Sequence, residues 1–209
     1  MKLKKKVKRN ILIIVVVALI ILLGFVIWSA IRNSNEEVKE VKVISQIDKY
    51  GYKLKENKPK AYKDMFKELE DILKEKEVDE EAYVKKISEM FIYDFYSLDD
   101  KAAKTDIGGV DFVYESIAPN FLQNAQDTYY KYVESNIYNN RNQKLPIVKD
   151  INVISTDQSP FAYGEETDEE AYNVEITWDY TDSAFSTYQK TATLVFIHDG
   201  VKLSLVELR

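Results

Sequence analysis

The feature that most constrains this chain is an uninterrupted apolar run close to its N-terminus. Ile11 to Ile31 is a stretch of 21 residues without a charged side chain. At about 1.5 Å per residue, a helix of this length spans the roughly 30 Å hydrocarbon core of a bilayer. A helix also satisfies its own backbone hydrogen bonds, which the bilayer interior requires. The run therefore predicts a transmembrane helix over residues 11–31.

The flanks of this run predict its orientation and its retention. Six basic residues precede it, the first acidic residue is Glu36, and Trp28 lies near the outer end. By the positive-inside rule, residues 1–10 form a basic cytoplasmic tail and the C-terminal part is extracytoplasmic. A cleaved signal peptide is the rival interpretation, but its apolar region is typically about 7–15 residues. We therefore expect a single-pass protein of the cell membrane, anchored in the lipid bilayer through residues 11–31.

The remaining residues are strongly acidic. Seven of the 29 basic residues lie at or before Arg32, which leaves 22 basic against 35 acidic residues, a net charge of −13 for residues 33–209. Such a domain repels nucleic acid, because phosphate neutralisation dominates that affinity. The chain has no cysteine, which excludes disulfides, thiol catalysis and cysteine zinc sites.

Residues 32–57 are predicted to be a stalk, and residues 38–50 fit a helix or a strand equally well. Pro59 then suits a helix start, and apolar residues follow at helical spacing, which predicts a helix over 59–76. The acidic turn at residues 79–81 suits the N-terminus of a second helix that runs to about Tyr96. A third helix is expected from about Ala118 to Tyr138.

After Pro146 the apolar period changes from 3.6 to 2, which indicates strands. Strands are expected over residues 147–153, 172–180, 191–198 and 201–208. Asp199-Gly200 between the last two favours a two-residue hairpin turn, which would place Phe196 opposite Leu203 and Leu194 opposite Leu205. The face of the sheet that carries these side chains would lie beneath the helices, and the other face would be largely polar and solvated.

Helices followed by strands predict an α+β extracytoplasmic domain over residues 58–209. About three helices would pack on one face of a roughly four-stranded antiparallel sheet. This layout resembles the cystatin-like α+β roll of the nuclear-transport-factor-like superfamily. With the basic tail and the membrane helix, it is similar to the bitopic scaffold subunit of type IV secretion and conjugation systems.

Two segments carry a further resemblance: YGYKLKENKPKAYKDMFKELEDIL (50–73) and FIYDFYSLDDKAAKTDIGGVDF (91–112). They look like segments of bitopic membrane proteins of low-GC Gram-positive bacteria. The resemblance implies an architecture and assigns no catalytic residue.

No catalytic, cofactor or metal site is predicted, and we expect no enzyme. His198 is the only histidine and lies beside the Asp199-Gly200 turn, where exposure is expected. No GxSxG, SxxK, HExxH or phosphate-loop pattern occurs, and Gly108-Gly109 is interpreted as a bend. Two acidic clusters, residues 99–111 and a predicted hairpin tip at residues 165–170, lack calcium-loop spacing.

The abundance of aromatic residues is the most suggestive feature. Tyr172, Trp178, Tyr180 and Phe196 are candidate ligand or interface residues, although aromatic residues at regular spacing more often belong to the core.

The leading hypothesis is an interaction or scaffold module with a protein partner in the membrane or envelope, as in an envelope, secretion or conjugation assembly. The alternative is a small-ligand binding or sensing domain with an aromatic cavity between sheet and helices. A carboxylate-based hydrolase is a third hypothesis, which would need two buried, convergent carboxylates.

Overall fold

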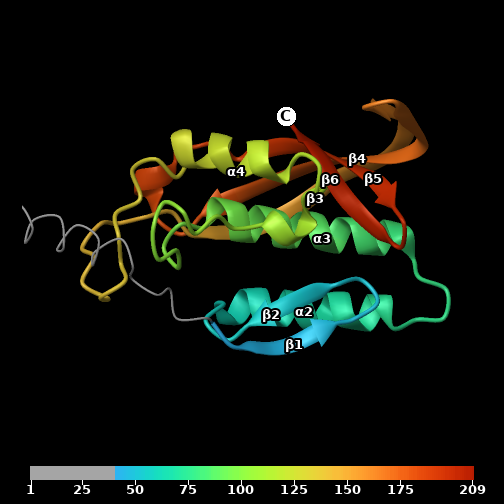
Figure 1. The fold of residues 1–209 in the computed structure, drawn as a ribbon. Helices are drawn as coiled ribbons and strands as arrows, with labels where there is room; N and C mark the ends of the chain where they lie inside the picture. Colours follow the sequence, from blue (N-terminus) through green and yellow to red (C-terminus); the bar gives the residue numbers. More distant parts are fainter. Residues whose placement is uncertain (1–40) are drawn as a thin grey trace, which may run out of the picture. The chain divides into compact units, whose positions relative to one another are not determined.

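The computed structural model describes residues 41–209, which form an α+β domain (Figure 1). The α-helices of this part are α2 (Lys60–Leu73), α3 (Glu80–Tyr96) and α4 (Ala118–Asp127), and the short 3-10 helices are η1 (Val110–Phe112) and η2 (Ser183–Phe185). The strands are β1 (Val43–Ile47), β2 (Tyr52–Lys55), β3 (Val148–Tyr163), β4 (Glu166–Tyr180), β5 (Thr191–Asp199) and β6 (Lys202–Leu208).

The membrane helix expected at residues 11–31 lies outside the described residues. Within residues 41–209, none of the helices has both the length and the apolar character needed to cross a bilayer.

Residues 43–55, within the expected stalk, form an antiparallel hairpin of β1 and β2. The segment that fitted helix and strand equally well is therefore a strand at Val43–Ile47. Tyr50, Tyr52 and Leu54 are buried in the hydrophobic core, so the hairpin packs as part of the domain.

The first two helices confirm their predicted positions. Pro59 precedes α2, whose buried side chains Tyr62, Phe66, Leu69 and Leu73 recur every three or four residues. The carboxylate of Asp79 caps α3 by accepting a hydrogen bond from the backbone N–H of Ala82 at 3.0 Å. α3 contacts α2 and also strands β3 and β4, so it lies between them and is buried on almost every side (Figure 1).

The third helix is shorter than predicted, because α4 ends at Asp127 rather than near Tyr138. At the end of α4, the hydroxyl of Thr128 donates to the carbonyl of Asn124 at 2.6 Å. Tyr130 then turns into the core, where its hydroxyl donates to the carbonyl of Phe95 at 2.7 Å and accepts from the N–H of Gly108 at 3.1 Å. These contacts replace helical continuation and leave Tyr132 75% exposed.

The expected antiparallel sheet is present, with strand order β3-β4-β5-β6. Trp178, Phe196, Leu203 and Leu205 are buried in the core beneath the helices, as predicted. The acidic stretch begins at the expected hairpin tip, since Glu165 lies in the turn between β3 and β4, but its other four acids continue along β4.

The predicted register of the last hairpin is wrong by two residues. Phe196 pairs with Leu205, and Asp199 pairs with Lys202, so the turn consists of Gly200 and Val201. Gly200 has a φ of 64°, which a glycine adopts without strain. Because the shift is an even number, the side chains remain on the predicted face.

The opposite face of the sheet is not simply solvated, because Val195 and Ile197 are fully buried on it. The long β3–β4 hairpin bends at its far end, as Figure 1 shows. There Tyr163 meets Tyr114 with ring centroids 5.7 Å apart, and the N–H of Tyr114 bonds to the carbonyl of Leu205 on β6. The hairpin end is thus brought to the β6 side of the sheet.

A buried charge on α3 holds the loop that follows it. Asp94 accepts hydrogen bonds from Lys101 at 2.9 Å, from the N–H of Gly109 at 2.8 Å and from Lys58. Burial alone would raise the pKa of Asp94, but Lys101 and Lys58 outweigh it and hold the pKa well below its usual range. A Cβ on Gly108 would lie 2.0 Å from the carbonyl oxygen of Asp94, which explains a glycine at this close approach.

We expect the substitution Asp94→Asn to lower the free energy of unfolding by about 3 kcal/mol, because Lys101 loses a partner in a buried site. Urea titration of the wild type and the variant measures this change. Asp64→Asn is the matched control, since it removes only the exposed pair with Lys60 and should cost less than about 0.5 kcal/mol. Equal losses in the two variants would contradict a special role for the buried charge.

Candidate functional site

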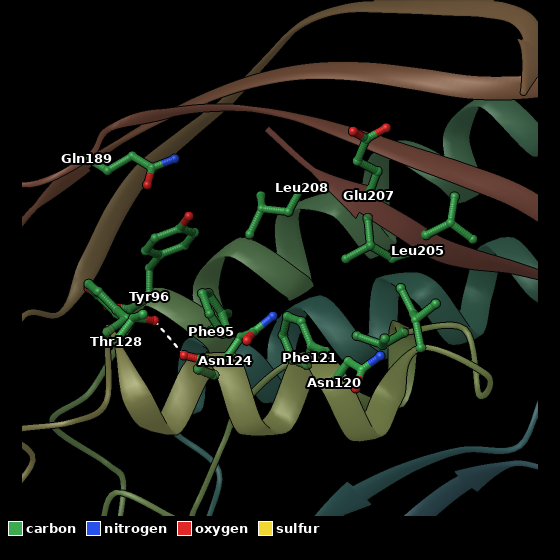
Figure 2. Close-up of a pocket in the computed structure, with 15 residues that line it drawn as sticks. Phe95, Tyr96, Asn120, Phe121, Asn124, Thr128, Gln189, Leu205, Glu207 and Leu208 are labelled. Atoms are coloured by element: carbon green, nitrogen blue, oxygen red, sulfur yellow. Dashed lines mark hydrogen bonds between the residues drawn. The ribbon is translucent and has the colours of Figure 1, made fainter. Parts of the chain in front are cut away.

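An open groove of about 560 Å³ lies between α4 and β6 (Figure 2). Phe95, Tyr96, Phe121 and Tyr129 supply aromatic side chains to it. Polar side chains also line it, namely Asn120, Asn124, Thr128, Gln189 and Glu207, and the remaining lining residues are Val113, Ile117, Ala125, Leu205, Val206 and Leu208. A lining of this kind, apolar with a few polar groups, is typical of binding sites.

The spacing of residues on α4 explains how one helix supplies both kinds of side chain. Ile117, Phe121 and Ala125 form one row at intervals of four, and Asn120, Asn124 and Thr128 form the neighbouring row. Residues four apart lie on the same face of a helix. The first row is half-buried or buried, whereas Asn120 and Asn124 are exposed. α4 therefore forms one wall of the groove with an amide-rich rim.

The other wall is β6, the edge strand of the sheet. The N–H and carbonyl of Arg209 both bond to Thr193 of β5, at 3.0 Å each. Since backbone groups alternate in direction along an antiparallel strand, those of Leu208 point away from β5. Within the described residues, the bridge that pairs with β6 on this side is at Val113 and Leu205, so the edge is open at Leu208.

The groove is nearly neutral. Burial raises the pKa of Tyr96 and of Tyr129, so both hydroxyls keep their protons near neutral pH. The hydroxyl of Tyr129 donates to the carbonyl of Tyr96 at 3.0 Å. Glu207 is the single charged side chain in the lining, and its hydrogen bond from Arg209 lowers its pKa, so it is ionised.

None of the four aromatic residues singled out in the sequence lines this groove. Trp178 packs behind it, with its ring centroid 4.5 Å from that of Tyr96. The hydroxyl of Tyr180 donates to the carbonyl of Gln189 at 2.9 Å, and Phe196 is fully buried opposite Leu205. Tyr172 lies elsewhere, beside His198. The sequence signal that could have located the groove is the pair of amides Asn120 and Asn124, which lie four residues apart next to an apolar row.

His198 makes more hydrogen bonds than we expected for a residue beside a turn. Its Nδ1 lies 2.9 Å from a carboxylate oxygen of Asp168 on β4, and its Nε2 lies 3.4 Å from Glu80 at the start of α3. Asp168 also accepts the backbone N–H of His198 at 2.7 Å. The imidazole therefore links the sheet to the N-terminus of α3.

These contacts change the proton affinity of His198. Burial alone would lower its pKa, but the hydrogen bonds to Asp168 and Glu80 outweigh burial and raise the pKa above its usual value of 6.5. The folded state thus favours the imidazolium form.

The acidic clusters have structural roles where they are described. Asp100 pairs with Lys101 at 2.7 Å, and Asp106 accepts the N–H of Ala102 at 2.9 Å. Among residues 41–209, no group of three or more histidine, cysteine or acidic side chains is arranged to hold a metal ion.

Comparison with known proteins found no matching family model, no matching curated protein and no matching solved structure.

We expect His198 to stabilise the fold most under mildly acidic conditions. A raised pKa in the folded state gives a contribution that is fully present below pH 6.5 and is lost as pH rises through the folded pKa. The difference in unfolding free energy between wild type and His198→Gln should therefore shrink between pH 6 and pH 9. Urea titrations at several pH values measure it, and NMR should show the single imidazole titrating above pH 6.5. A difference that grows with pH would refute the assignment.

Proposed function

We propose that this protein is a membrane-anchored extracytoplasmic interaction module, and that a protein partner docks in the groove between α4 and β6. The observation that carries the proposal is the groove itself, an open, nearly neutral surface with an aromatic lining beside a strand edge that is open at Leu208. Aromatic side chains are enriched in protein interfaces, where they bury large area at low entropic cost. The role as a subunit of an envelope, secretion or conjugation assembly remains part of this proposal.

Exposed aromatic residues next to α4 support a partner of macromolecular size. Tyr132 is 75% exposed and Tyr138 is 72% exposed in the segment that follows α4, and Ile137 between them is 49% exposed. Contiguous exposed apolar side chains are characteristic of docking sites, and these three lie close together in the sequence.

A small ligand is the second candidate. A volume of about 560 Å³ falls within the range of about 300–1,000 Å³ for small-molecule sites, and the aromatic lining suits a planar apolar compound. The openness of the groove favours the protein partner, because small-molecule sites bury most of their ligand.

Site-specific photocrosslinking in cells tests the docking surface. A benzophenone amino acid at Asn120, on the exposed rim of the groove, should give a discrete protein adduct. The same amino acid at Lys67, exposed on α2, is the control and should not give that adduct. Mass spectrometry of the adduct identifies the partner. The same adduct formed at Lys67 with equal yield, or no adduct at Asn120, would reject the groove as the docking surface.

Protease treatment of intact cells tests the anchoring and its orientation. Protease added outside should digest residues 41–209, and the chain should stay with the membrane fraction after a high-salt wash. Mature protein whose N-terminus begins near residue 31 would show a cleaved signal peptide instead.

A further inference from the structure

The open edge of β6 indicates what kind of partner segment fits the groove. We propose that the groove binds an extended peptide segment of another protein, which adds as a strand beside Leu208 and places alternate apolar side chains on Phe95 and Phe121. This inference rests on the proposed interaction function and specifies its partner. It follows from the backbone of β6, from the size of the groove and from its charge.

The backbone of Leu208 is the first observation. Its N–H and carbonyl point away from β5, because Arg209 makes both hydrogen bonds to Thr193. Leu208 also lines the groove. An extended peptide satisfies such groups with its own backbone, as in recognition by strand addition. A helix cannot do so, because its backbone groups already pair within the helix.

The length of the groove walls sets the length of the segment. α4 has ten residues and is therefore about 15 Å long. A strand rises about 3.3 Å per residue, so the wall accommodates about four to five residues of extended chain. Successive side chains of a strand point in opposite directions, so every second residue faces the aromatic lining.

The walls of the groove also exclude the sheet edge of a second folded copy as the ligand. α4 lies alongside β6 and carries the rim residues Asn120 and Asn124, as Figure 2 shows. A second folded copy would have to bring its own α4 to the same place if it paired through β6. A single peptide chain has no such obstacle, and the two rim amides can donate to and accept from its polar side chains.

The charge of the site restricts the composition of the peptide. Glu207 is the one charged side chain in the lining and is paired with Arg209 at 2.6 Å, so the long-range repulsion comes from the net charge of −13 carried by residues 33–209. An acidic segment would be repelled on approach, whereas a neutral or basic segment would be attracted. The expected ligand is therefore a neutral or basic peptide with apolar residues at alternate positions.

Peptide display on the full-length protein in detergent micelles tests this proposal. Random 12-residue peptides are selected on the wild type and counter-selected on Asn124→Trp, in which an indole fills the groove at an exposed position. Enriched peptides should show apolar residues at every second position and few acidic residues. Enrichment of a helical spacing of three and four, or no enrichment at all, would overturn the proposal.

Backbone methylation separates strand addition from simple apolar contact. An enriched peptide is synthesised with N-methyl groups on alternate amides along one edge, and a second version carries them along the other edge. One version should bind at least tenfold more weakly and the other should bind with nearly unchanged affinity, because only one edge faces β6. Equal affinity of the two versions would contradict pairing with the strand.

A matched pair of protein variants probes the same hydrogen bond from the other side. Leu208→Pro and Leu208→Ala both remove the leucine side chain, but only proline removes the N–H that points to the groove. Proline is tolerated on an edge strand when its missing N–H faces outward. Peptide affinity should be at least tenfold weaker for the proline variant, and equal affinities would refute the role of the backbone.

The outcomes distinguish this inference from the function on which it rests. An adduct at Asn120 in cells together with failure of the strand tests would keep the interaction module and reject the strand-like ligand. Strand-like peptides that bind in micelles, without an adduct at Asn120, would establish the peptide specificity and reject the cellular docking role.

Discussion

The burial of α3 is the constraint on which the rest of this domain depends. The C-terminal part of α3, from Met90 to Tyr96, is apolar on almost every side and must be covered on almost every side, which no single sheet can do. α2 covers one part of its surface, and strands β3 and β4 contact another part. Asp94 places a negative charge within this packing, and Lys101, Lys58 and the N–H of Gly109 neutralise it.

The loop held by Asp94 positions the groove. It fixes the chain from Lys101 to Gly109, and Val113 then bridges to Leu205 at the edge of the sheet. α4 begins five residues later, so the helix is placed alongside β6 by a loop that is anchored at both ends. The groove exists because the chain leaves the edge strand after one bridge instead of continuing along it.

Much of the fold could be predicted from periodicity. α2, α3 and the four-stranded sheet appear where the apolar spacing indicated, because a buried face selects one side chain in two or in about 3.6. β3 and β4 nevertheless extend beyond the expected segments, to Tyr163 and from Glu166, and β1 and β2 lie in the expected stalk. The end of α4 could not be predicted, because the tertiary contacts of Tyr130 with Phe95 and Gly108 override a helical pattern. The turn of the last hairpin was misplaced for a similar reason, since Asp199 pairs with Lys202 and its carboxylate accepts the hydroxyl of Ser204 at 2.9 Å.

The candidate site was harder to predict than the fold. The regular aromatic positions, such as Trp178 and Phe196, belong to the core, because a strand that alternates strictly hides one of its faces. The groove combines one face of α4 with the edge of β6, about 80 residues away in sequence. A strand edge is a property of the sheet order, which side-chain patterns in a single sequence do not reveal.

The wall that α4 builds beside β6 has a further effect on the behaviour of the protein at high concentration. An unprotected strand edge invites copies of a chain to stack through their backbones into fibrils. Here α4 stands across the groove from β6, and the net charge of −13 carried by residues 33–209 makes copies of the chain repel one another. The domain therefore leaves the open backbone groups of β6 available to an extended peptide while disfavouring fibril formation by its own copies.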